Sequence, residues 1–217
     1  MILLVNKKGW GNGFRKIAVC SILFLALLAA CERHTDKQKV SSSGYGLSAE
    51  ELSSLQSGDI IFRMGYGGLS LSIVSILSDT IKVSHCGIVA KDSTGIAVIH
   101  TISPSISEAD GMQQCTIEEF IADSRRNSIA AVRFKHGKGQ KIVEKAVYYL
   151  NKQVPFDMAF NLVDSSKFFC SELPIRILKD EFNFDLLQGK EPVMSSCKFS
   201  VFFNPQHFET IIYHLSR

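Results

Sequence analysis

The chain has 217 residues, with 24 Lys and Arg against 21 Asp and Glu, and a formal net charge of +3 with neutral histidines. Four of the basic residues and none of the acidic ones lie in the first 30 positions, which leaves 20 basic and 21 acidic residues and a charge of −1 for the remainder. A nucleic-acid-binding protein needs a concentrated basic face, so this composition gives no support for a nucleic-acid partner.

The first 30 residues have the pattern of an export signal. Basic residues precede an apolar run from Ile17 to Ala30, which is too short for a comfortable membrane span. The run ends in Leu-Ala-Ala-Cys, which resembles the lipobox at which bacterial lipoprotein signals are cut. We therefore expect a signal peptide over 1–30 and a lipid on Cys31, with an uncleaved anchor helix as the alternative.

Polar residues follow the lipidation site. The stretch from Cys31 to Gly46 has almost nothing to bury, so residues 31–46 are expected to form a lipidated cysteine and a flexible tether. Glu32 and Arg33 lack the aspartate that retains such lipoproteins in the inner membrane, which favours the periplasmic face of the outer membrane. Residues 47–217 suit one domain with its own core, held to a membrane.

The first half of this domain shows short helical and strand patterns. In chain order the sequence predicts a helix over 48–55, a strand over 60–62, a short buried helix over 69–77 and strands over 85–90 and 96–102. The last two strands flank Asp-Ser-Thr-Gly at 92–95, whose composition predicts a tight turn. These two strands are expected to form a hairpin.

The second half is more helical. Thr116-x-x-Glu119 is a capping box, and the sequence further predicts a strand over 129–134, a helix over 140–150, a helix from Cys170 and a last helix after Asn204-Pro205. The predicted class is α+β, with antiparallel strands grouped in the middle and a helix at each end.

Cys170 is the candidate nucleophile. An apolar approach, Lys-Phe-Phe, leads to Cys170, and Ser-Glu and a helical pattern follow it. A cysteine at a helix N-terminus lies at the positive end of the helix dipole, which stabilises the thiolate. A buried structural cysteine is the alternative, and only a nearby base decides between the two.

Two of the six histidines are candidates for that base. His85 starts the predicted hairpin and His100 ends it, so both imidazoles can reach a common site. The other four are expected to be solvated or structural: His34 in the tether, His136 beside a glycine, and His207 and His214 on the predicted terminal helix.

Four segments together resemble a known family. They are Leu-x-x-Gly-Asp-Ile-Ile-Phe at 55–62, Ser-His-Cys-Gly-Ile-Val at 84–89, Val-Ile-His at 98–100 and Phe-Cys-Ser-Glu-Leu at 169–173. Their order resembles that of the circularly permuted papain-like cysteine hydrolases of the NlpC type, and among them the YiiX- and YaeF-like lipoproteins. The resemblance implies a central antiparallel sheet packed against helices.

The resemblance also implies roles for particular residues. Cys170 would be the nucleophile, His85 the general base, and His100 the third member, at a position where the family commonly carries Glu. Phe156 and Asp157 resemble a Tyr-Asp pair that forms a wall of the substrate cleft. The implied reaction is hydrolysis of an amide or ester through a Cys170 thioester, on envelope peptides, acyl-amides or lipids, with no cofactor or metal.

Three alternatives remain open at this stage. The acyl group on Cys170 can pass to an amine or hydroxyl, because the permuted fold also resembles lecithin:retinol-type acyltransferases. A zinc site from His85, Cys86, His100 and Cys170 has suitable residue types, but adjacent strand residues point to opposite faces. The third alternative is a noncatalytic binding lipoprotein.

Asp59 and the cysteines of the domain are the remaining candidates for a role in the fold or the site. Asp59 follows Gly58 ahead of a strand, which favours a turn-capping role over catalysis. The domain's cysteines lie at 86, 115, 170 and 197, a spacing that is not a disulfide framework. With Cys170 free, at most one pair forms among the other three, and the sequence does not indicate which.

Overall fold

The computed structural model describes residues 45–105, 107, 109–190 and 193–215. The predicted signal peptide, Cys31 and nearly all of the predicted tether therefore lie outside the described residues. Residues Ser43–Arg217 form a compact unit of their own. Within the described residues, no helix is long and apolar enough to cross a membrane.

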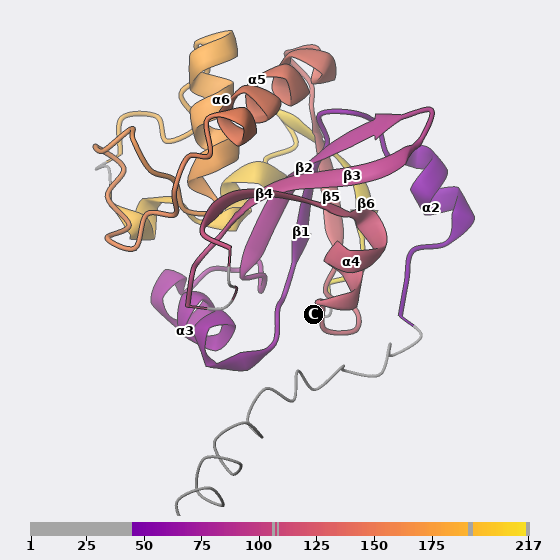
Figure 1. Cartoon of the computed structure of the whole chain (residues 1–217), viewed down its shortest axis with the longest axis horizontal. Helices are drawn as coiled ribbons and strands as arrows, with labels where there is room; N and C mark the ends of the chain where they lie inside the picture. The colour runs from indigo at the N-terminus through magenta and orange to yellow at the C-terminus, as the bar shows by residue number, and fades with distance from the viewer. Residues whose placement is uncertain (1–44, 106, 108, 191–192, 216–217) are drawn as a thin grey trace, which may run out of the picture. The chain divides into compact units, whose positions relative to one another are not determined.

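A six-stranded antiparallel sheet forms the centre of this unit, in the order β4-β3-β2-β1-β5-β6 (Figure 1). Its strands are β1 (Ile60–Arg63), β2 (His85–Asp92), β3 (Gly95–Ile102), β4 (Gly111–Thr116), β5 (Ala130–Phe134) and β6 (Phe208–Tyr213). The predicted β2–β3 hairpin is confirmed, with Asp92 paired to Gly95 across its turn.

The helices are short, and two of them begin with sequence-encoded caps. They are α2 (Ala49–Ser54), α3 (Gly67–Leu77), α4 (Ile117–Ala122), α5 (Gly139–Asn151) and α6 (Glu172–Phe182), with 3₁₀ turns η1 (Met194–Ser196) and η2 (Phe199–Phe203). The Thr116–Glu119 capping box is confirmed at α4, and Ser48 with Glu51 caps α2 in the same way. Each box satisfies backbone N–H groups that have no acceptor within the helix.

The sheet has a hydrophobic cluster on each face. On one face, alternate strand residues such as Phe62, Ile88 and Val132 pack with α5 and α6. On the other face, Ile61, Val89 and neighbouring residues pack with α4. Figure 1 shows α5 and α6 on one side of the strands. Because side chains alternate along a strand, the two faces carry different sets of residues from the same segments.

Close backbone contact joins the turn before β1 to the start of α5. Gly58 has a φ of 89°, and a Cβ on it would lie 2.4 Å from the Gly139 Cα. Asp59, which is fully buried, accepts a hydrogen bond from the Gln56 N–H at 2.8 Å and pairs with Arg133, also at 2.8 Å. These contacts confirm that Asp59 caps the turn.

The structure differs from the sequence expectations in three places. The segment after Pro205 is strand β6 and not a helix, because Phe-Glu-Thr-Ile-Ile-Tyr buries Phe208 and Ile212 against the sheet. The His207 and His214 positions therefore flank a strand. Strand β4 was not predicted, since its sequence, Gly-Met-Gln-Gln-Cys-Thr, is mostly polar. The helix expected over 69–77 exists as α3, but of its residues only Leu77 is buried.

Candidate active site

Cys170 lies immediately before α6, as predicted. Ser171 is the helix N-cap, and the Glu172 and Leu173 N–H groups donate to the Phe169 carbonyl at 3.0 and 3.3 Å. The Cys170 thiol donates to the carbonyl oxygen of Ser84 at 3.8 Å. That oxygen belongs to the peptide group joining Ser84 to His85, so the candidate nucleophile lies at the start of the strand that carries the candidate base.

The surroundings of Cys170 favour its thiolate. Contact with the Cys86 thiol is the largest influence and lowers the Cys170 pKa, and burial opposes this effect. Backbone N–H groups of Ser171, Cys86 and Cys170 lower the pKa further, as expected where N–H groups converge at a helix start. The Cys86 thiol in turn donates to the Cys170 carbonyl at 3.2 Å, and burial raises its own pKa well above the usual value.

His85 and His100 form a hydrogen-bonded pair on the face of the sheet that packs against α4, opposite α6. The His85 Nε2 and the His100 Nδ1 are 2.8 Å apart, and both rings contact Phe120 of α4, with centroids 5.8 and 5.7 Å away. Gly87 makes room for this pair, since a Cβ there would lie 2.5 Å from Val98 Cγ1 and 3.1 Å from the His100 Cβ. Gly87 of the Ser-His-Cys-Gly segment is thus required because a larger residue would clash with Val98 and His100.

Arg63 is a site residue that the sequence argument missed. It pairs with His85 across β1 and β2, and its guanidinium carbon lies 5.0 Å from the centre of the Phe120 ring. The Arg63 side chain is only 9% exposed, while its ion-pair partner Asp123, at 3.6 Å, is 76% exposed. The guanidinium charge is therefore incompletely neutralised. The single arginine in an otherwise apolar strand, two positions after Ile61, was the available signal.

Burial and Arg63 keep both histidines uncharged at neutral pH. Burial is the main reason that the His85 pKa lies well below its usual value, and the Arg63 charge and the neighbouring His100 lower it further. The same two causes, burial first and Arg63 second, lower the His100 pKa to about 3. Among the described residues, the only buried side-chain N or O atoms without a hydrogen-bond partner are Arg63 Nε and His100 Nε2.

The predicted wall residues have mainly structural contacts. Phe156 forms an isolated parallel bridge with Phe168, and its ring lies 6.0 Å from that of Phe160. Asp157 is buried, and its carboxylate accepts backbone N–H groups of Ala159 and Asn161. The Asp157 carboxylate thus braces its own loop, and a role of this pair in substrate binding stays a prediction.

All four cysteines in the described chain are free thiols. The residues considered for zinc are divided between the sheet faces, since Cys86 packs in the cluster with Cys170 and α6 while His85 contacts Phe120 of α4. In the part of the chain that the structure describes, no three His, Cys, Asp or Glu side chains are grouped as metal ligands.

One cavity lies away from these residues. It has a volume of about 570 Å³ between α5, α6 and the loop before Cys170. Its lining combines basic and aromatic side chains, including Lys145, Tyr148, Lys152 and Arg176, but neither Cys170 nor His85. Lys145 and Arg176 are already paired with carboxylates, at 3.2 Å to Glu181 and 2.8 Å to Glu172.

An antiparallel sheet with a cysteine before a helix on one face and a histidine on an adjoining strand is the arrangement of papain-like cysteine hydrolases. A family model described as permuted papain-like amidase enzyme, YaeF/YiiX, C92 family, matches residues 54–190. The chain belongs to this family, and it is a cysteine hydrolase with a permuted papain-like fold. The predicted fold and family are thereby confirmed.

A solved structure shares this fold. It is described as metalloprotein yiiX from Escherichia coli O157:H7, with a TM-score of 0.55 and 18% identity, and the match covers 75% of this chain and 99% of that one. No curated protein matches the chain. Among the described residues of this chain, no His, Cys, Asp or Glu side chains are grouped as the metal site of a metalloprotein would require.

Proposed function

We propose that the chain is a membrane-anchored amidase or peptidase that cleaves an amide or ester bond through a thioester on Cys170. One observation carries this proposal: the Cys170 sulfur lies at the N-terminus of α6 and against the Ser84–His85 peptide group. A thiolate is favoured at that position, and the histidine pair begins at the next residue. Family membership supports the amide substrate class.

The hydrogen bond between the histidines supports His85 as the base. Its Nε2 is occupied by His100, which leaves Nδ1 as the ring nitrogen that is free to accept a proton. In this tautomer the His85 Nε2–H donates to His100, and His100 carries its own proton on Nε2. His100 then orients the base without adding a negative charge, unlike a carboxylate in the same position.

The reaction proceeds in two steps in this proposal. The Cys170 sulfur bonds to the substrate carbonyl carbon while His85 takes the thiol proton, and the Cys170 backbone N–H stabilises the oxyanion. The protonated His85 then donates this proton to the leaving group as the C–N or C–O bond breaks. Water, deprotonated by His85, releases the acyl group from Cys170 and restores the thiol.

The proposed location follows from the sequence before the domain. Lipidation of Cys31 would hold the enzyme at the periplasmic face of the outer membrane. Envelope peptides, acyl-amides and lipids are the molecules available there, and we propose them as the substrate classes. A variant of this function passes the acyl group to an amine or hydroxyl in place of water.

Trapping the acyl-enzyme tests the proposal directly. The protein is incubated with envelope extract and the mass attached to Cys170 is determined after proteolysis. We expect an acyl adduct on Cys170 in wild type, and accumulation of little or none in His85→Ala. The matched control is Cys115→Ala, which removes a half-buried thiol away from α6. If wild type shows no adduct and its Cys170 reacts with iodoacetamide no faster than an ordinary thiol, the chain is a noncatalytic binding protein.

A further inference from the structure

Helix α3 has an exposed face without charge. No Asp, Glu, Lys or Arg occurs from Met64 to Ser78. The exposed positions of the helix are Gly67, Gly68, Leu71, Ser72, Ser75 and Ile76. Leu71 is 52% exposed and Ile76 59% exposed. The solvent face of a surface helix normally carries charged residues, as α5 does with Lys141 and Glu144. Exposed apolar side chains on a helix without charged residues are a candidate interaction surface.

This helix lies next to the candidate active site. It connects the end of β1, which carries Arg63, to the segment before β2, which begins with His85. A Cβ on Gly65 would lie 2.7 Å from the Ser70 Oγ of α3, and the Gly65 N–H donates to the Ser84 Oγ at 3.0 Å. The Ser84 carbonyl is the group that contacts the Cys170 thiol. The first turn of α3 is therefore connected to the nucleophile through Gly65 and Ser84.

We propose that α3 is a membrane-contact helix, whose exposed Leu71 and Ile76 insert into the surface of a lipid bilayer. This inference rests on the anchor in the proposed function, because the bilayer is the one that holds Cys31. Contact at α3 would place the start of β2 and Cys170 close to the lipid surface. Substrates that are lipids or lipid-linked would then reach the site without leaving the membrane.

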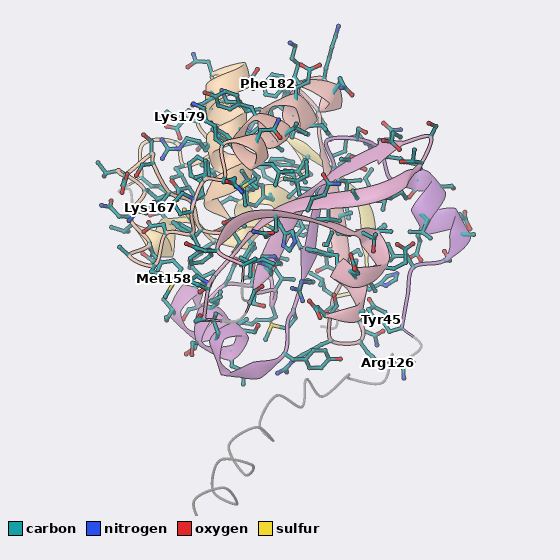
Figure 2. All side chains as sticks on the ribbon, viewed as in Figure 1. Tyr45, Arg126, Met158, Lys167, Lys179 and Phe182 are labelled. Atoms are coloured by element: carbon teal, nitrogen blue, oxygen red, sulfur yellow. The ribbon has the colours of Figure 1, made fainter. Side chains whose placement is uncertain are left out.

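The length of the tether permits this contact. Fourteen residue steps separate Cys31 from Tyr45, where the described chain begins. Even fully extended, these span at most about 50 Å, so the domain cannot leave the neighbourhood of the bilayer. Tyr45 and α3 both lie toward the lower edge of the domain in the view of Figures 1 and 2. One orientation therefore lets the tether start and α3 approach the same surface.

The composition of α3 fits binding to lipid at its exposed face. With no basic residue on the helix, binding would come from burial of Leu and Ile and not from attraction to anionic lipids. Serine and glycine at the remaining exposed positions keep the helix free of charges that would resist insertion. Binding should therefore depend little on lipid charge or salt.

Tryptophan fluorescence tests the contact in the fragment 43–217. This fragment forms a compact unit that contains both hydrophobic clusters, and it lacks tryptophan because the single Trp of the chain is Trp10. Leu71→Trp is compared with Val163→Trp, a control at an exposed apolar residue outside α3 that is 73% exposed. Each is mixed with phosphatidylcholine vesicles, with and without brominated acyl chains.

We expect the emission of L71W to move to shorter wavelength and to be quenched by brominated lipid, with neither change in V163W. Replacing Ile76 by Ser in L71W should lower the vesicle partition constant about tenfold, the effect of one buried aliphatic side chain. Equal behaviour of the two tryptophans would overturn the proposal, as would binding confined to phosphatidylglycerol vesicles and lost in high salt. A blue shift of L71W that grows with protein concentration in the absence of vesicles would instead identify a second copy as the occupant.

The readout is independent of the proposed chemistry. Adding Cys170→Ala to L71W should leave the vesicle titration unchanged. Loss of acyl-enzyme formation with normal vesicle binding would count against the hydrolase alone. Normal acyl-enzyme formation without vesicle binding would count against the membrane contact alone.

Discussion

The two faces of the sheet favour opposite charge states of their titratable groups, charged on the α6 face and uncharged on the α4 face. On the α6 face, the Cys86 thiol and backbone N–H groups lower the Cys170 pKa and so favour the thiolate. On the α4 face, burial and the Arg63 charge lower the pKa values of His85 and His100 and so favour uncharged imidazoles. A cysteine–histidine site usually gains from an imidazolium beside the thiolate. Here the surroundings lower the Cys170 pKa without an imidazolium.

This difference indicates how the thiolate is charge-balanced. Arg63 is a cation that acts on both histidines, and it also interacts electrostatically with Asp123 after α4, Cys115 of β4 and Cys170 before α6. A guanidinium stays protonated at any relevant pH, whereas an imidazolium does not. The site therefore keeps a permanent positive charge on the α4 face and leaves His85 free to accept a proton.

The largest effects are expected from removing the proposed nucleophile on the α6 face and the proposed base on the α4 face. Cys170→Ala should abolish formation of the acyl-enzyme. His85→Ala should lower its rate by at least about a hundredfold, the usual contribution of a general base. Mass spectrometry of the trapped intermediate measures both. His136→Ala, at an exposed histidine, is the control and should behave as wild type. An unchanged rate in His85→Ala would show that the thiolate alone carries the reaction.

Acid should destabilise the fold through the α4 face. The folded His100 pKa is about 3, below the ordinary value of 6.5, so its contribution to stability is present above pH 6.5 and is lost as the pH falls toward 3. Between pH 6.5 and 4.5 the loss is about 2–3 kcal/mol for this group. Urea unfolding at the two pH values measures it. His100→Gln should reduce the dependence, whereas His136→Gln should not.

Glu172 on the α6 face makes the stability depend on pH in the opposite direction, with loss as the pH rises. Burial is the main cause that raises its pKa from 4.5 to about 7, against the Arg176 ion pair. Its contribution to stability is therefore full below pH 4.5 and is lost as the pH rises through 7. Glu172→Gln should flatten this part of the profile and leave the acid loss from His100 in place. If both variants changed the same limb, the two faces would not titrate independently.

Arg63→Met removes the permanent charge on the α4 face and so tests its effect on the histidine pKa values. We expect the pKa of the histidine pair to rise by at least about one unit, as removal of a nearby like charge favours the imidazolium. NMR titration of the imidazole nitrogens measures this, and Arg63→Lys, which keeps the charge, should titrate like wild type. Asp123→Asn should shift the pKa values down, because it removes the partner of Arg63 at an exposed position. Identical titrations of R63M and R63K would contradict the electrostatic role.

Local signals in the sequence were sufficient for most elements near the site. The capping box at Thr116, the Asp-Ser-Thr-Gly turn and the apolar approach to Cys170 each depend on neighbouring residues, and the structure contains all three features. The failures are segments whose state depends on distant partners. Strand β6 forms because β5 offers it an edge, and β4 forms by pairing with β3.

Arg63 was missed for the same reason. Its role comes from the register that places it opposite His85 and from Phe120, 57 positions along the chain. No periodicity within β1 reveals this neighbourhood. The hydrogen bond between His85 and His100, by contrast, could be anticipated, because a predicted hairpin brings its two ends together.

Cys86→Ala should have the smallest effect, and it tests the α6 face alone. The Cys86 thiol is the largest influence that lowers the Cys170 pKa, but three backbone N–H groups remain in the variant. We expect the Cys170 pKa to rise and its alkylation by iodoacetamide at neutral pH to slow by a few-fold, because less thiolate is present. The pH dependence of alkylation, followed by mass spectrometry at Cys170, measures the shift. Cys197→Ala, which removes another buried thiol, is the matched control and should leave the profile in place. Since Cys86 lies on the opposite face from His85, the histidine titration should not change, and a change there would mean that the two faces are coupled through β2.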